Sequence, residues 1–271
     1  MALAESGNAP SGVYILHDLV HNDAVVRSLK NRGVSIVNSP DGLPEGSTLI
    51  FSAHGVGEAL ERQARSLPLI VKDATCPLVK RVHELAVTRH REGRFILLAG
   101  KRGHCETEGI LGRVPPGCAR LLESEAEAEA FEPEPGRRYV LLSQTTFLAR
   151  GFERIAAILT GKIPDLQIER TICPATADRQ DAVRRLARAC GAVIVVGSPE
   201  SSNSRRLCEC ARSAGSRAYL MSETSEIPTE LNSFSGTIGL ISGASASEDE
   251  VQSVLARLLK LPGSSFAGEF K

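Results

Sequence analysis

The sequence predicts an α/β protein of three pseudo-equivalent lobes with mostly parallel sheets, the first lobe being truncated. Short apolar runs alternate with helical periods, which is the pattern of parallel sheets covered by helices. In addition, the chain repeats itself with a domain-sized period of roughly 95 residues. Two copies of the repeat hold matching turns, Ala74-Thr75-Cys76-Pro77 and Thr171-Ile172-Cys173-Pro174. We therefore expect equivalent strand ends to surround a central metal or cluster site.

The repeat also sets the expected lobe boundaries. The first lobe covers residues 1–67, the second 68–165 and the third 166–262, and residues 263–271 form a C-terminal tail. The first lobe is N-terminally incomplete because the cysteine turn of the repeat is absent from it. In each copy, one strand ends in a polar loop and a later strand ends in a Ser-containing loop. The expected strands are residues 14–16, 49–51, 69–71, 95–98, 139–142, 193–196 and 238–241.

Composition excludes several classes of function. The 271 residues are 42% hydrophobic, enough to bury sheets, and include 32 basic and 32 acidic side chains. Because no dense basic stripe is visible, we expect no nucleic-acid partner. No apolar run approaches the roughly 18 residues of a membrane span, and the N-terminus lacks the features of a signal peptide. We expect a cytoplasmic protein without membrane contact, in which the seven cysteines are reduced.

The two cysteine turns are suited to metal ligation. Pro77 and Pro174 each fit the first turn of a helix, where a missing N–H costs little. The preceding thiols, those of Cys76 and Cys173, would then lie near helix N-termini, which stabilise a thiolate. A single free cysteine is more often a small buried apolar residue, but the equivalence of these two favours a ligand role. We expect the cysteines without such equivalence to be structural or incidental: Cys118, Cys190, Cys208 and Cys210.

Neutral polar side chains, nearly all hydrogen-bond donors, follow the remaining strands. At the carboxyl ends of parallel strands such donors can form an anion pocket, suited to a diphosphate without a Lys/Arg cluster. For any single residue, a helix N-cap or a turn residue is an equally good interpretation. The residues are His21, Asn22, His54, His104, Thr145, Thr146, Ser201, Ser202, Asn203 and Ser245.

Glu106 is the carboxylate best placed for chemistry, because it comes two residues after His104 at an expected strand end. Partial burial beside an anion would raise the pKa of this carboxyl group and allow it to relay protons. The alternative is a solvated glutamate that stabilises the first turn of the following helix. Glu108 should point elsewhere on that helix.

Taken in order, these segments resemble the motifs of the IspH/LytB family of 4-hydroxy-3-methylbut-2-enyl diphosphate reductases. The resemblance spans roughly positions 13 to 260, nearly the whole chain. The matching segments are residues 17–22 (HDLVHN), 51–55 (FSAHG), 73–79 (DATCPLV), 103–109 (GHCETEG), 143–146 (SQTT), 173–180 (CPATADRQ), 195–198 (VVGS), 201–204 (SSNS) and 243–246 (GASA).

The resemblance implies a three-lobed enzyme with a [4Fe–4S] cluster held by one cysteine from each lobe. Such an enzyme removes an allylic hydroxyl with two electrons and two protons and yields isopentenyl and dimethylallyl diphosphates, with ferredoxin or flavodoxin as electron donor. Cys76 and Cys173 would be cluster ligands and Glu106 the proton source, while His104 and Thr145 would position the hydroxyl. The diphosphate would be held by His21, His54, Ser201, Ser202, Asn203 and Ser245.

The main departure from the family lies at the N-terminus, where a strand and a Gly-Phe-Cys turn are missing. We expect a shortened chain, and the alternative is a natural variant without the third protein ligand. A second departure is Cys105, where the family more often has proline. Two other functions stay open: a non-catalytic cluster- or diphosphate-binding homologue, such as a redox sensor, and a zinc site formed by Cys76, Cys173 and histidines.

Overall fold

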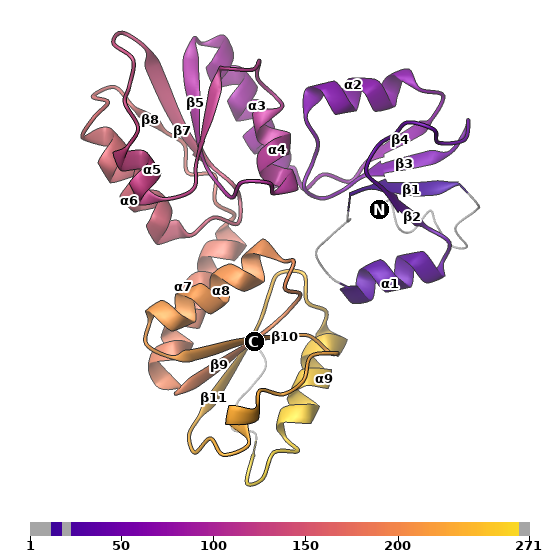
Figure 1. The fold of residues 1–271 in the computed structure, drawn as a ribbon, viewed down its shortest axis with the longest axis vertical. Coiled ribbons are helices and arrows are strands. Elements are labelled where there is room, and N and C mark those ends of the chain that lie inside the picture. Colours follow the sequence, from indigo (N-terminus) through magenta and orange to yellow (C-terminus); the bar gives the residue numbers. More distant parts are fainter. Residues whose placement is uncertain (1–11, 18–22, 266–271) are drawn as a thin grey trace. The chain divides into compact units, whose positions relative to one another are not determined.

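The computed structural model describes residues 12–17 and 23–265, and the chain divides into two compact units, Met1–Cys173 and Pro174–Lys271. Every paired strand in the described ranges runs parallel to its neighbours, and helices separate most successive strands (Figure 1). The predicted α/β class with parallel sheets is therefore confirmed. No helix in these ranges combines the length and apolarity of a membrane span.

The first sheet of the first unit has the strand order β2-β1-β3-β4. Its central strands are apolar, because Ile15, Leu49 and Phe51 are almost completely buried. Parallel pairing requires a crossover between strands, and helices provide two of these crossovers. The strands are β1 (Val13–Leu16), β2 (Ser35–Val37), β3 (Thr48–Phe51) and β4 (Ile70–Asp73), and the helices are α1 (Asp23–Asn31) and α2 (Glu58–Ser66).

The second sheet of this unit has the order β6-β5-β7-β8. Its strands are β5 (Arg94–Ala99), β6 (Ala119–Leu122), β7 (Arg138–Ser143) and β8 (Gln167–Ile168). Its helices are α3 (Pro77–Arg91), α4 (Cys105–Leu111), α5 (Glu125–Glu129) and α6 (Ala149–Thr160).

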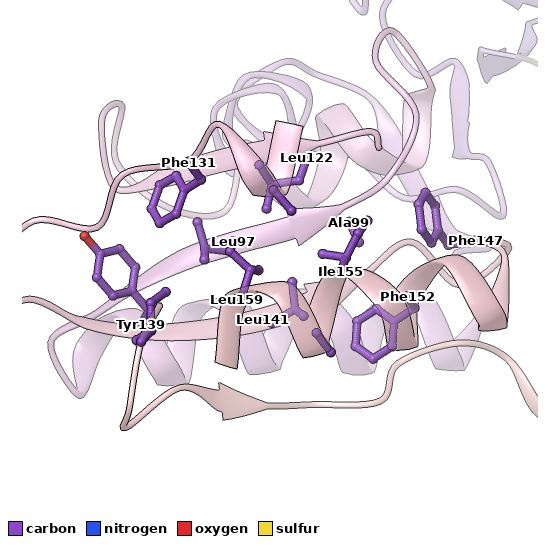
Figure 2. Close-up of a cluster of buried hydrophobic side chains, with 13 residues drawn as sticks. Leu97, Ala99, Leu122, Phe131, Tyr139, Leu141, Phe147, Phe152, Ile155 and Leu159 are labelled. Carbon is purple, nitrogen blue, oxygen red and sulfur yellow. The ribbon is translucent and has the colours of Figure 1, made fainter. Parts of the chain in front are cut away.

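Alternate residues of the central strands β5 and β7 belong to two separate hydrophobic cores. Leu97 and Leu141 pack with Phe152 and Leu159 of α6 (Figure 2). Their neighbours in sequence face the other side, where Ile96 joins a cluster that includes residues of α3 and α4. Successive side chains of a strand point to opposite faces, so apolar runs such as these are typical of a sheet buried on both sides.

The strand before each cysteine turn belongs to the sheet of the preceding lobe. Asp73 at the end of β4 pairs with Phe51 of β3, and Ile168 of β8 pairs with Leu141 of β7. The expected boundaries at residues 67 and 165 therefore fall before the last strand of each sheet. The sequence indicated a strand at residues 69–71 but none at β8, and main-chain hydrogen bonding decides which sheet each of the two joins.

The second unit contains a three-stranded sheet with the order β10-β9-β11 in its described part. The central strand is apolar and completely buried, and it lies between two strands that follow it in the chain. The elements are α7 (Pro174–Ala189), β9 (Ala192–Val196), α8 (Ser202–Ser213), β10 (Arg217–Met221), a 3₁₀ turn η2 (Thr229–Leu231), β11 (Ile238–Ser242) and α9 (Glu248–Leu258).

Candidate active site

Five of the functional residues expected in the first unit follow strand ends in the structure. His54 comes after β3, Cys76 after β4, His104 after β5, Thr145 after β7 and Cys173 after β8. Because neighbouring strands are parallel, their carboxyl ends lie at one edge of each sheet, which is where ligands bind in open α/β folds. The topology therefore gathers these side chains at the carboxyl edges of the two sheets.

The two cysteine turns have the same main-chain arrangement. The N–H of Cys76 donates to the carbonyl of Ala53 at 3.0 Å, and that of Cys173 donates to the carbonyl of Thr145 at 2.9 Å. In both cases the acceptor lies in the loop after the neighbouring strand. Each cysteine is followed by a proline that begins a helix, and both thiols are free and half-buried. The turns thus present two thiols in the same way.

Glu106 lies in the first turn of α4 and is only 2% exposed. Its Oε1 accepts a hydrogen bond from the main-chain N–H of Thr145 at 2.6 Å. Burial raises the pKa of the carboxyl group to about 7, although hydrogen bonds from Thr145 and Gln144 oppose the rise. At neutral pH this group can therefore exist in both protonation states, as a proton donor requires. Glu108, by contrast, is exposed.

His104 caps the N-terminus of α4 and is buried. Its Nδ1 accepts a hydrogen bond from the main-chain N–H of Glu106 at 3.1 Å. Since a main-chain N–H can only donate, the proton of the neutral ring resides on Nε2. The ring therefore offers an N–H donor, which suits an oxygen anion or an alcohol better than a cation.

The imidazole of His54 lies beside that of His104. The ring centroids are 5.5 Å apart with the planes nearly perpendicular. Together with Cys105, the two histidines bring three possible ligand atoms within 4.8 Å of one another. The tautomer of His104 argues against a metal here, because binding through Nε2 would require removing the proton that the cap fixes there.

Gln144 also belongs to this region, although nothing in the sequence distinguished it from the other residues of its motif. It is 1% exposed, and its Oε1 accepts the main-chain N–H of Lys101 at 3.1 Å. Its Nε2 donates to the hydroxyl of Thr146 at 3.0 Å, and its side chain also hydrogen-bonds Glu106. Gln144 thus ties together the loops that follow β5 and β7. Its position directly before Thr145 was the available signal.

In the second unit, the expected donors lie at the ends of two neighbouring strands. Ser201, Ser202 and Asn203 follow β9, and Ser245 follows β11, which pairs with β9. The hydroxyl of Ser201 accepts the N–H of Ser204 at 3.3 Å, so this serine is also the N-cap of α8.

Asn203 is buried, with 4% of its surface exposed, and neither atom of its amide group has a hydrogen-bond partner among the described residues. An unpaired buried polar group costs about 1–3 kcal/mol. Such groups in native proteins call for an explanation such as a ligand.

The prediction for His21 cannot be compared with the structure, because this residue and Asn22 lie outside the described residues. Two surface cavities in the described part of the first unit are lined by other residues, including Pro115 and Glu127 in one and Pro133 and Lys162 in the other.

Comparisons with known proteins identify the family of this chain. Residues 1–259 match the family described as LytB protein. A 4-hydroxy-3-methylbut-2-enyl diphosphate reductase of Psychrobacter arcticus is 42% identical over 253 residues, which are 91% of this chain and 79% of the relative. The enzyme of the same name from Alcanivorax borkumensis is 40% identical over 256 residues, covering 93% and 82% of the two chains.

Two solved structures of reductases also match this chain. The E-1-hydroxy-2-methyl-but-2-enyl-4-diphosphate reductase of Plasmodium falciparum matches with a TM-score of 0.88 at 28% identity, over 97% of this chain and 86% of that one. A second reductase structure, described as the terminal enzyme of the non-mevalonate pathway, matches with a TM-score of 0.62 at 30% identity, over 96% and 91%. This chain belongs to the LytB family, whose matched members are named 4-hydroxy-3-methylbut-2-enyl diphosphate reductases.

Proposed function

We infer that this chain reduces 4-hydroxy-3-methylbut-2-enyl diphosphate to isopentenyl and dimethylallyl diphosphates, the last step of the non-mevalonate isoprenoid pathway. The family membership supports the reaction, since relatives of this name align with more than nine-tenths of the chain. The observation that carries the proposal is Glu106, a buried carboxyl group whose pKa of about 7 suits proton transfer at neutral pH. It lies between two groups that can contact an alcohol, His104 and Thr145.

We propose that Cys76 and Cys173 help to hold a [4Fe–4S] cluster. Their chemistry fits, because both thiols are free, half-buried and presented by equivalent turns, and thiolates are the usual ligands of such clusters. When bound, the cluster would supply electrons singly and an iron atom acting as a Lewis acid. We expect a small electron-transfer protein such as ferredoxin or flavodoxin to reduce it. The free cysteines also support a reducing compartment, the cytoplasm.

In the proposed reaction, Glu106 donates a proton to the allylic oxygen, which departs as water. The C–O bond breaks, two electrons enter the allyl group, and a second proton completes the product. The main-chain N–H of Thr145 holds Oε1 of Glu106, and the side chains of Thr145 and Gln144 also hydrogen-bond the carboxyl group, so the proton donor is held in a defined position. We propose that the Nε2–H of His104 and the hydroxyl of Thr145 orient the alcohol.

The diphosphate requires several hydrogen-bond donors, and we propose that two groups of residues supply them. His54 and His104 offer ring N–H groups in the first unit. In the second unit, the amide of Asn203 is the strongest candidate because it is buried and lacks a partner among the described residues. The full proposed set is His21, His54, His104, Thr145, Ser201, Ser202, Asn203 and Ser245.

The test is anaerobic reconstitution of the full chain with iron and sulfide, followed by metal counting and turnover with a chemical reductant. The proposal expects a bound [4Fe–4S] cluster and formation of both product diphosphates. The Glu106→Gln variant should retain the cluster and lose turnover. A stable cluster without turnover in the unaltered chain would instead support a non-catalytic homologue. Zinc in place of iron and sulfide would support the zinc site.

A further inference from the structure

His83 is a buried histidine at the place where α3 and α4 contact the loop after β3. It lies on α3 and is 5% exposed. The Nε–H of Arg113 donates to its Nδ1 at 3.0 Å, and Nη1 of Arg113 forms an ion pair with Glu61 of α2 at 2.8 Å. Because Nδ1 accepts, the proton of the neutral ring is on Nε2. Arg113, itself paired with Glu61, therefore fixes the orientation of the His83 ring.

Two glycines form the surface against which this ring packs. Gly55 directly follows His54 and has a φ of +71°, and a Cβ at this position would lie 2.6 Å from Cε1 of His83. A Cβ on Gly109 of α4 would lie 3.4 Å from Nε2 of His83 and 3.5 Å from the carbonyl of Gly55. The ring of His83 therefore packs directly against the His54 turn and α4, and the methyl group of Thr75 lies at the same place, 3.0 Å from a Cβ at Gly55.

The same two segments also meet one turn further along α4. The main-chain N–H of Glu58 donates to the carbonyl of Gly112 at 3.0 Å. A Cβ on Gly112 would lie 2.9 Å from Cα of Gly57, so the backbones approach as closely as glycine allows. A side chain added at either glycine would therefore push the main chain at Gly57 and the end of α4 apart.

Packing alone does not explain a histidine at position 83. Its Nε2 has no hydrogen-bond partner among the described residues, and an unpaired buried N–H group destabilises a fold. An aliphatic side chain would fill the space without that cost. A flat ring held at one edge by Arg113, however, fixes the distance between the Gly55 main chain and α4 more strictly than a flexible side chain would.

We propose that His83 is a positioning residue that sets the His54 turn against α4, so that the His54 imidazole lies correctly beside His104. The proposal rests on the role of His54 in substrate binding inferred above. His83 itself touches Gly55 and Gly109 and acts only through the residues next to them. Its effect on the reaction should therefore depend on the presence of the His54 imidazole.

The test compares His83→Asn in two backgrounds of the full chain. Asparagine retains an acceptor near the position of Nδ1 but removes the outer part of the ring. In the otherwise unaltered enzyme, kcat/KM should fall at least tenfold, mainly through KM. In the His54→Ala background the same change should cost less than twofold. Val82→Ala, buried on the same helix within the sheet core, is the control for lost stability and should leave KM unchanged.

A second measurement does not depend on turnover. In the chain labelled with ¹⁵N-histidine, before cluster reconstitution, His83→Asn should shift the ring resonances of His54, whereas Val82→Ala should not. Equal losses of kcat/KM in both backgrounds, or unchanged His54 resonances in a folded His83→Asn variant, would overturn the proposal. If the unaltered chain binds a cluster but shows no turnover, the reductase assignment fails, and the resonances alone decide the role of His83.

Discussion

Replacing Glu106 by glutamine should change both the stability and the activity of this protein in a pH-dependent way. Glutamine has the same shape and can accept the Thr145 N–H through its Oε1, but it carries no titrating proton. In the folded chain, burial raises the pKa of Glu106 from 4.5 to about 7. The folded state therefore binds more protons than the unfolded state between these two pH values.

The raised pKa of Glu106 makes the folded state less stable as the pH rises. Stability contributed by the protonated carboxyl group is fully present below pH 4.5 and is lost as the pH rises through about 7. A pKa change of this size corresponds to about 3 kcal/mol at high pH, as an order of magnitude. Glu106→Gln removes this penalty, so the variant should gain about 3 kcal/mol relative to the unaltered chain between pH 4 and pH 8.

Denaturant unfolding at a series of pH values measures this difference. The same variant should lower kcat by about 10²- to 10⁴-fold, the usual contribution of a general acid. In the unaltered enzyme, kcat should decline as the pH rises above about 7, because the proton donor is then ionised. Two unfolding curves with the same pH dependence would refute the assignment of a buried, titrating Glu106. A variant that turns over at the original rate would refute its role as proton source.

Three further results are expected. Cys76→Ser and Cys173→Ser should each lower the iron and sulfide retained after reconstitution, whereas Cys118→Ser should not, and equal retention in all three would exclude the two turns as ligands. Asn203→Ala should raise KM by roughly ten- to a hundredfold, the value of one hydrogen bond to a charged group, with little effect on kcat in steady-state assays. Burial and the nearby Arg113 lower the pKa of His83 from 6.5 to about 4. Because the unfolded state then binds more protons, acid between these values should destabilise the fold by up to about 3 kcal/mol, and urea titrations should show a shallower pH dependence for His83→Asn.

Several features of the fold could be predicted from the sequence because they depend on local patterns. The apolar runs at residues 95–98 and 193–196 are strands in the structure, as β5 and β9. Pro77 and Pro174 begin helices, as their fixed backbone geometry indicated. The sequence did not reveal which sheet the strands before the cysteine turns would join. Both strands pair with the sheet formed by the strands that precede them in the chain. Contacts between segments far apart in the sequence determine this pairing.

In the candidate site, too, local sequence patterns predicted some features, and contacts between distant residues decided others. Residue types and spacing indicated the two cysteine turns and the donors that follow the strands, since the carboxyl ends of parallel strands must lie at one edge. The sequence could not show that Gln144 joins two loops, or that the ring of His83 lies between Gly55 and Gly109. The contact between Gln144 and Lys101 joins residues 43 positions apart, and the contacts of His83 with the two glycines also join distant segments, so they leave no periodic signal.

The sequence by itself determined the parallel α/β architecture, the repeated cysteine turns and the membership of the family, because each is encoded in short segments read in order. Only the tertiary structure decided the protonation of the groups that would perform the reaction. The pKa of Glu106 depends on its complete removal from water and on a hydrogen bond from Thr145, 39 positions away. The tautomer of His104 depends on its place at the start of α4. Desolvation and hydrogen-bond geometry arise only when the chain is folded, so chemical reactivity at this site is a property of the tertiary structure.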